Sequence, residues 1–168
     1  MSGEFETSVR EWVADNLPEP LVGVSIGMYG VASEDPAVLE AFEQWRARLA
    51  AQGWGAPTWP TEYGGAGLTD AQAKVISRAI AKAGSMNPIP YLAGMGVTMV
   101  GLTLLEYGTD KQKARHLPGM ASGEVRWCLG LSEPNAGSDL ASLKASAEMV
   151  NEEWVLNGQK TWTSGADK

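Results

Sequence analysis

The hydrophobic pattern of the chain changes its period near residue 124, and this change is the strongest constraint on the fold. Up to Ser122, apolar residues recur at intervals of three and four, as on one face of a helix. Residues 143–149 instead alternate apolar and polar side chains, which is typical of a half-exposed strand. Helices followed by strands predict an α+β multidomain fold. We expect an N-terminal all-α helical domain over residues 1–124 and the first strands of a β-barrel-like domain over residues 125–168.

The predicted helices have recognisable starts and ends. N-cap and capping-box residues mark the starts: Asp35 before Pro36, Thr69 with Gln72, and Thr109 with Gln112. Residues that stop a helix mark the expected ends: Pro18, Gly53, Gly84 and Pro118. We therefore expect four or five amphipathic helices around one apolar helix that runs from about Tyr91 to Tyr107.

The segment from Pro88 to Leu105 contains no charged residue, so its length makes it a candidate membrane span. It also contains Pro90 and several glycines, and basic residues flank it on both sides. A helix that is apolar all round is equally typical of the centre of a soluble helical domain. We favour a buried helix and expect no membrane span.

The last part of the chain contains three strand signals. Val125–Leu131 is a short apolar run suited to a buried strand, and residues 143–149 form the alternating one. Asn157-Gly158 between apolar runs predicts a hairpin with a type I′ turn. In that hairpin Trp162 and Ser164 share one strand face, opposite to Trp154. Since the β pattern is still running at Lys168, the chain reads as truncated.

Composition excludes some functions. The net charge of −7 disfavours nucleic acid, because neutralising phosphates requires a basic surface. Cys128 is the only cysteine, so an intramolecular disulfide is excluded, which fits a reducing compartment. The acidic N-terminal residues resemble neither a signal peptide nor a transit peptide. We expect a soluble, cytoplasmic protein without a metal site.

Two loops combine small and polar residues. Ser132–Asp139 lies between expected strands; its N–H groups near Gly137 and Ser138 can form an anion site, although such turns more often only connect strands. The second loop, residues 53–67, is rich in glycine, proline and aromatic residues. We interpret it as a packed connection; the alternative is that its Gly64-Gly65 pair lets the backbone approach a ligand. From the residues alone, both alternatives for each loop stay open.

Four ordered segments resemble the acyl-CoA dehydrogenase family. GLSEPNAGSDLAS at 130–142 is similar, position for position, to the family's first signature. The other three, which resemble family motifs along essentially the whole chain, are GWGAPTWPTEYGGAG at 53–67, YGTDKQKARHLPGMASGE at 107–124 and NGQKTWTSGA at 157–166.

This resemblance implies that the β domain binds FAD. By analogy, Leu131 and Ser132 meet the pyrimidine edge of the flavin, and Gly137 and Ser138 lie at the pyrophosphate. Trp162 packs on the ring face, and Ser164, where threonine is frequent in the family, bonds near the reactive nitrogen.

The resemblance places the catalytic carboxylate in a C-terminal helical domain, to which no residue here can be matched. We therefore assign no catalytic residue in this chain. Glu133 and Asp139 are interpreted as structural parts of the signature turn, and His116 as a surface or boundary histidine.

The implied function is FAD-dependent introduction of an α,β double bond into an acyl-CoA thioester, as in fatty-acid β-oxidation or related acyl catabolism. The expected partners are an acyl-CoA substrate, an unidentified electron acceptor and further subunits of a homo- or hetero-oligomer. The alternatives are a flavin-dependent oxidase or monooxygenase of the same fold, or a non-catalytic subunit of a hetero-oligomeric dehydrogenase.

Overall fold

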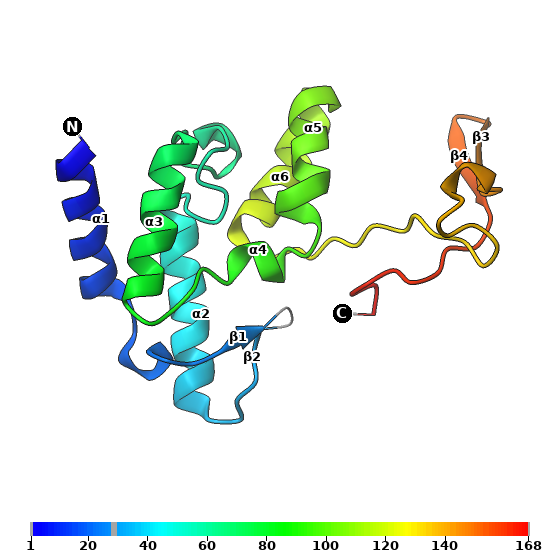
Figure 1. Ribbon diagram of the computed structural model, residues 1–168. Coiled ribbons are helices and arrows are strands. Elements are labelled where there is room, and N and C mark those ends of the chain that lie inside the picture. The colour runs from blue at the N-terminus through cyan, green and yellow to red at the C-terminus, as the bar shows by residue number, and fades with distance from the viewer. Residues whose placement is uncertain (1, 28–29, 168) are drawn as a thin grey trace. The chain divides into compact units, whose positions relative to one another are not determined.

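A computed structural model describes residues 2–27 and 30–167 of the chain. It divides into two compact units, Met1–Trp127 and Cys128–Lys168 (Figure 1). The first unit is mainly helical and the second carries a β-hairpin, which confirms the predicted fold class. The last helix of the first unit ends at Ser122, and no residue from 125 to 131 is helical. The predicted domain limits, 1–124 and 125–168, stay predictions.

The three helices α1 (Ser2–Asn16), α2 (Pro36–Ala51) and α3 (Asp70–Lys82) enclose the larger hydrophobic core. The predicted caps form: the Asp35 carboxylate accepts a hydrogen bond from the Ala37 N–H at 2.9 Å, and Thr69 and Gln72 make a complete capping box. Trp45 is fully buried at the centre, and its indole N–H donates to the Met86 carbonyl at 3.0 Å. The helices are therefore fixed both by local caps and by one shared core.

Residues 53–67 form the packed, irregular connection that the sequence predicts. Trp54, Ala56 and Trp59 are buried in it, and η2 (Thr61–Tyr63) is its only regular turn among the described residues. A Cβ atom on Gly65 would lie 2.2 Å from the Trp59 carbonyl oxygen, so only glycine fits there. Trp59 also belongs to a second, smaller core, which it shares with Leu117 and Met120.

The expected single helix from Tyr91 to Tyr107 is wrong. The segment forms α4 (Ile89–Leu92), the π-helix η3 (Gly96–Val100) and α5 (Gly101–Tyr107). Gly94 has a φ of 61° and interrupts the helix, and the Met95 N–H bonds to the Trp127 carbonyl at 2.9 Å instead of continuing it. Nor is the segment buried all round, because Met99 and Leu102 are 45% and 52% exposed. No helix among residues 2–27 and 30–167 is long and apolar enough to cross a membrane.

Helix α6 (Asp110–Ser122) begins at the predicted Thr109–Gln112 capping box but does not end at Pro118. Proline removes one backbone donor from a helix, yet Leu117, Met120 and Ala121 are buried on both sides of it. Burial of this apolar face outweighs the lost bond, and the helix continues to Gly123, whose φ of 72° caps it.

Between α1 and α2 lie η1 (Glu19–Leu21) and two short strands, β1 (Ile26–Gly27) and β2 (Gly30–Val31).

The second unit contains η4 (Leu140–Ser142) and an antiparallel hairpin of β3 (Ser146–Val150) and β4 (Glu153–Asn157). Its turn is Asn151-Glu152, with φ angles of 50° and 66°, and Met149 pairs with Trp154. The predicted hairpin around Asn157-Gly158 is therefore wrong, and residues 158–163 are not in a strand. Val125–Leu131 also forms no strand; it contributes only a single bridge, between Trp127 and Gly94.

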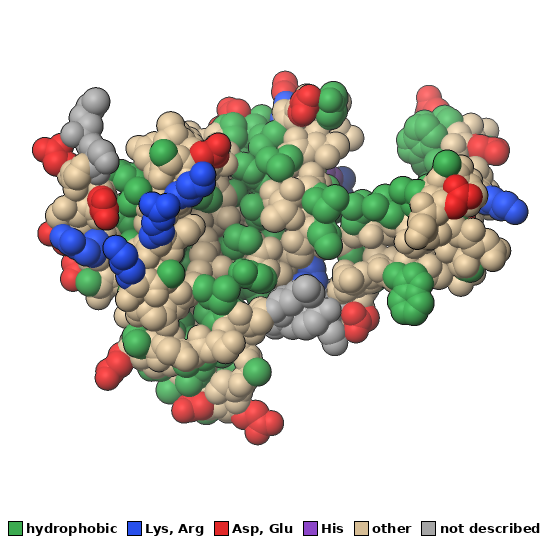
Figure 2. All heavy atoms as spheres, viewed as in Figure 1, with side chains coloured by type: hydrophobic (Ala, Val, Ile, Leu, Met, Phe, Trp, Pro, Cys, Tyr) green, Lys and Arg blue, Asp and Glu red, His purple; other side chains and the backbone are tan. Residues whose placement is uncertain are grey.

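The hairpin turn sits at Asn151-Glu152 because this position lets five residue pairs form, from Ser146 with Asn157 to Val150 with Glu153. Asparagine tolerates positive φ angles, so the turn needs no glycine. All ten strand residues are exposed, and green apolar side chains are visible on the surface of this unit (Figure 2).

Candidate cofactor-binding site

Residues 130–133 and 160–163 lie side by side in the second unit. The Thr161 N–H donates to the Ser132 carbonyl at 2.9 Å, and the Lys160 Nζ donates to the Leu131 carbonyl at 3.0 Å. A Cβ atom on Gly130 would be 3.3 Å from the Lys160 side chain, which leaves little space between the two segments. The structure thus places the predicted Leu131 and Ser132 next to the segment that carries Trp162.

A tight turn follows Ser132. Glu133 and Ala136 exchange two backbone hydrogen bonds, of 2.9 and 3.1 Å, around a Pro134-Asn135 corner. Ala136 is 2% exposed, whereas the predicted residues Gly137 and Ser138 after it are exposed. Among the described residues, no group accepts a hydrogen bond from the N–H of Gly137 or Ser138. An anion could accept from these donors, and the anion site at this turn stays a prediction.

Glu133 occupies the centre of the two adjoining segments. Its carboxylate accepts hydrogen bonds from the backbone N–H of Lys144 at 2.8 Å and of Ala145 at 2.9 Å, and from the Lys160 Nζ at 3.0 Å. These bonds, those from the two backbone groups first, lower the pKa of Glu133 to about 2. Because both oxygens accept hydrogen bonds and the pKa is lowered, Glu133 is poorly suited to act as a general base near neutral pH.

Trp162 has two unusual properties. Its side chain is 92% exposed, and its φ is 57°, in the left-handed region that a bulky residue rarely adopts. Trp162 and Ser164 lie outside any strand, so the prediction that they share one strand face is wrong. Strained residues cluster at binding sites. The contact of Trp162 with the flavin stays a prediction.

The described residues fit the cofactor that the resemblance implies. A flavin dinucleotide combines a flat ring system with an anionic pyrophosphate. The exposed indole of Trp162 is suited to the ring, and the free N–H groups of Gly137 and Ser138 are suited to the phosphates. Ser164 is exposed and keeps its hydroxyl available. No hydrogen bond within the described chain links 137–138 to 160–164, so the assignment of all six predicted residues to one ligand stays a prediction.

The other candidates from the sequence do not join this site. His116 packs edge-on against Trp127, with ring centroids 5.3 Å apart, as expected for a boundary histidine. The Asp139 backbone carbonyl accepts bonds from Ser142, which is a structural role in the turn. Among the residues described, no three potential metal ligands come together.

Lys160 is the residue that the sequence analysis missed. It is the only cation between Lys144 and Lys168, and it follows the Asn157-Gly158 pair closely. The absence of other basic residues around Lys160 could have drawn attention to it. Its partner Glu133 is 27 residues away, however, and sequence spacing does not reveal such a pair.

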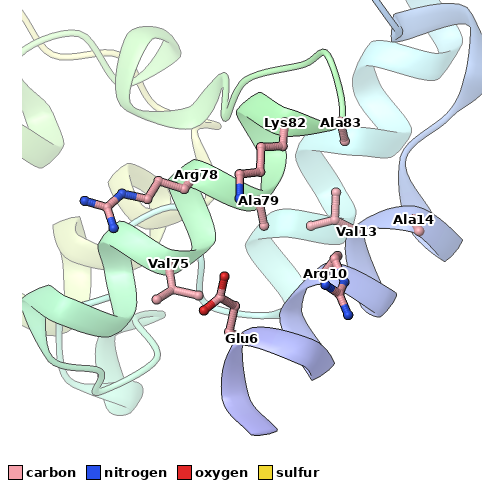
Figure 3. A pocket seen from close by; sticks show the side chains of 9 residues that line it. All are labelled: Glu6, Arg10, Val13, Ala14, Val75, Arg78, Ala79, Lys82 and Ala83. Atoms are coloured by element: carbon pink, nitrogen blue, oxygen red, sulfur yellow. The ribbon is translucent and has the colours of Figure 1, made fainter. Parts of the chain in front are cut away.

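A groove of about 340 Å³ lies between α1 and α3 in the first unit (Figure 3). Val13, Val75 and Ala79 contribute apolar surface, and Arg10, Arg78 and Lys82 supply positive charge. Blue basic side chains gather on this part of the surface in Figure 2. None of the residues predicted to contact the flavin lines this groove.

Comparison with known proteins covers both units. Residues 4–124 match the family model described as acyl-CoA dehydrogenase, N-terminal domain, and residues 128–168 match the one for the middle domain. Acyl-CoA dehydrogenase IpdE1 from Mycobacterium tuberculosis (strain ATCC 25618 / H37Rv) is 40% identical over 164 residues, which are 96% of this chain and 40% of that protein.

Two solved structures extend the comparison. The Tcur3481-Tcur3483 steroid ACAD matches with a TM-score of 0.65 and 34% identity, over 98% of this chain and 40% of that one. The ChsE4-ChsE5 complex from Mycobacterium tuberculosis matches with a TM-score of 0.62 and 30% identity, over 98% and 39%. The chain therefore spans about 40% of the length of these relatives.

Proposed function

Because the chain belongs to the acyl-CoA dehydrogenase family, we propose that it forms part of an FAD-dependent oxidoreductase that introduces an α,β double bond into acyl-CoA thioesters. The observation that carries the proposal is the arrangement of the second unit. There the signature turn lies against the segment of an exposed, strained tryptophan, and no described residue accepts a hydrogen bond from the N–H groups of Gly137 and Ser138.

Each predicted residue has a role in holding the cofactor. Gly137 and Ser138 donate their N–H groups to the pyrophosphate, and Leu131 and Ser132 border the pyrimidine edge of the flavin. Trp162 covers one ring face, and the Ser164 hydroxyl bonds near the reactive nitrogen and tunes the ring's electronics. When bound, FAD supplies the acceptor for the hydride that leaves the β carbon of the acyl group.

The proton at the α carbon requires a base, and none of this chain's residues is assigned that role. Glu133 and Asp139 each adjoin a predicted site residue in sequence, and we interpret both as structural parts of the signature turn. Three hydrogen bonds occupy the Glu133 carboxylate, which makes it a poor base. On the family resemblance, we propose that a C-terminal helical domain supplies this base.

The relatives support a class of substrate and an assembly. A relative at 34% identity is a steroid ACAD, so acyl-CoA esters of steroid derivatives belong beside fatty acyl-CoA esters in the first substrate panel. Two solved relatives carry paired names, Tcur3481-Tcur3483 and ChsE4-ChsE5. They support an oligomer that includes a second type of subunit, and they keep the non-catalytic subunit open as a second function. The electron acceptor is a further protein or small molecule, and we place the enzyme in the cytoplasm.

Anaerobic titration of the full-length protein tests the proposal. The purified protein should be yellow with FAD, and its visible flavin absorbance should fall when the correct acyl-CoA is added. Folded full-length protein that neither carries flavin nor acquires it from added FAD would refute the proposed cofactor. A flavin that stays oxidised with every acyl-CoA, alone and with a co-expressed partner subunit, would instead favour the non-catalytic alternative. Hydrogen peroxide or an oxygenated product released in air would favour the oxidase or monooxygenase.

A further inference from the structure

The polar pair of Glu133 and Lys160 is the strongest connection between the segments assigned to the flavin. Glu133 accepts three hydrogen bonds of 2.8 to 3.0 Å, one of them from Lys160. Lys160 donates a further hydrogen bond, of 3.0 Å, to the Leu131 carbonyl. The Glu133 side chain is only 8% exposed and that of Lys160 is 34% exposed. Charge-assisted hydrogen bonds of this geometry are about twice as strong as neutral ones.

This pair connects three stretches of chain. Glu133 itself belongs to the signature turn, Lys144 and Ala145 lie just before β3, and Lys160 precedes Trp162 by two residues. The Thr161 N–H also donates to the Ser132 carbonyl at 2.9 Å, between the same two segments. Any change that separates Glu133 from Lys160 therefore moves the turn and the tryptophan segment relative to each other.

Few other forces hold these stretches together. Within residues 128–167, Ala136 is the only buried residue, so burial of apolar side chains contributes little there. Exposed ion pairs stabilise weakly in general. This carboxylate differs because two of its three donors are backbone N–H groups, whose positions are fixed by the chain.

We propose that Glu133 and Lys160 are positioning residues, which hold the signature turn and the Trp162 segment at the separation that flavin binding requires. This inference rests on the proposed function, and it goes beyond it because neither residue was assigned a role toward the cofactor. Neither side chain needs to touch FAD, since both act through the backbone of their neighbours.

The test uses Glu133→Gln and Lys160→Met in the full-length, flavin-loaded protein. Glutamine offers one acceptor oxygen to three donors, so at least one donor loses its partner. Methionine keeps the stem of Lys160 and removes only the charged donor. Glu148→Gln in β3 and Lys144→Met are matched controls, because neither side chain has a partner among residues 2–27 and 30–167. Lys144→Met keeps the backbone N–H that donates to Glu133.

We expect Glu133→Gln to raise the FAD dissociation constant by about 10- to 100-fold, and Lys160→Met by about 3- to 10-fold. The visible flavin spectrum should shift in both, while the controls bind FAD normally. Hydrogen exchange of the flavin-free proteins gives a second readout. Residues 130–133 and 157–161 should exchange faster in both variants, with the helices of the first unit unchanged.

The reversed pair Glu133→Lys with Lys160→Glu separates positioning from simple charge attraction. A lysine at position 133 cannot accept from the Lys144 and Ala145 N–H groups, so the reversed pair should not restore FAD affinity. Full recovery by the reversed pair would overturn the role assigned to the backbone bonds.

The two proposals fail in different ways. If the wild-type protein binds FAD and both variants match their controls in affinity, spectrum and exchange, the positioning role is overturned and the proposed function survives. If Glu133→Gln does not fold, Lys160→Met alone decides, since it leaves both backbone bonds intact. Wild-type protein without FAD affinity overturns both.

Discussion

At the scale of single residues, the site depends on side chains in unfavourable surroundings. Trp162 combines a left-handed backbone conformation with a 92% exposed indole, and each of these is costly for a tryptophan. A bound flat ring system would cover that indole. The contact of Trp162 with the flavin is therefore a prediction that substitution of the tryptophan can test.

Trp162→Ala should weaken FAD retention in the full-length protein. Loss of the aromatic contact removes about 0.5–1.5 kcal/mol beyond the buried area, and FAD fluorescence titration measures it. Because the indole contacts little protein, thermal stability of the flavin-free form should change little. Trp154→Phe is the control, since Trp154 lies in β4 beside Met149. A flavin spectrum that responds to Trp154→Phe and ignores Trp162→Ala would contradict the assignment.

The pH response of the signature turn should follow Glu133. Its folded pKa is depressed to about 2, so its stabilising bonds are complete above the ordinary value of 4.5 and are lost as the pH falls toward 2. The amide NMR signals of Lys144 and Ala145 should therefore move in that window. In Glu133→Gln this transition should be absent. Its persistence in that variant would show that another group is titrating.

At the scale of elements, the predicted helix starts follow local capping, whereas close approaches between elements depend on contacts between distant residues. Gly101 shows this most clearly: a Cβ atom there would lie 2.1 Å from the Trp59 ring and 2.8 Å from the Gly96 carbonyl oxygen. The start of α5 can approach the 53–67 loop only because residue 101 has no side chain.

Gly101→Ala should therefore destabilise the first unit, although alanine is the better helix former. Overpacking of this kind costs about 1–3 kcal/mol, which urea unfolding followed by circular dichroism measures. Gly3→Ala is the matched control, because nothing lies within 4 Å of a Cβ atom at that position of α1. It should be neutral or stabilising by up to about 1 kcal/mol. Equal stability of Gly101→Ala and wild type would show that the Trp59 ring can move aside.

At the scale of the whole chain, the two units are stabilised differently. The first has two hydrophobic cores, one around α1, α2 and α3 and a smaller one around Trp59 and α6. The second has an exposed two-stranded hairpin, and the ion pair of Glu133 with Lys160 connects its loops. A lone two-stranded hairpin is marginally stable in water, so the second unit depends on additional structure or ligand for its rigidity.

Native-state hydrogen exchange of the 168-residue chain should reveal this difference. Amides of α2 and α3 should open only with global unfolding, while those of β3 and β4 should exchange by low-energy local opening. Protection in β3 and β4 equal to that in α2 would contradict this prediction. Urea at low concentration provides the check, because global opening responds to it and local opening does not.

The sequence alone determined the features that depend on near neighbours. The caps at Asp35, Thr69 and Thr109 formed as predicted, because each capping bond spans two or three residues. The sequence alone also indicated the family, because each of the matching motifs is a contiguous stretch of residues.

The tertiary structure decided what depends on distant residues. Trp127 binds the backbone at Met95 and so breaks the expected long helix, while buried neighbours carry α6 past Pro118. The hairpin turn forms at Asn151-Glu152 and not at Asn157-Gly158, because pairing along the two strands outweighs the turn preference of Asn-Gly. Glu133 and Lys160 form an ion pair although 27 residues separate them in sequence. In each case the free energy of a contact between remote residues exceeded a local preference, and local patterns do not encode such contacts.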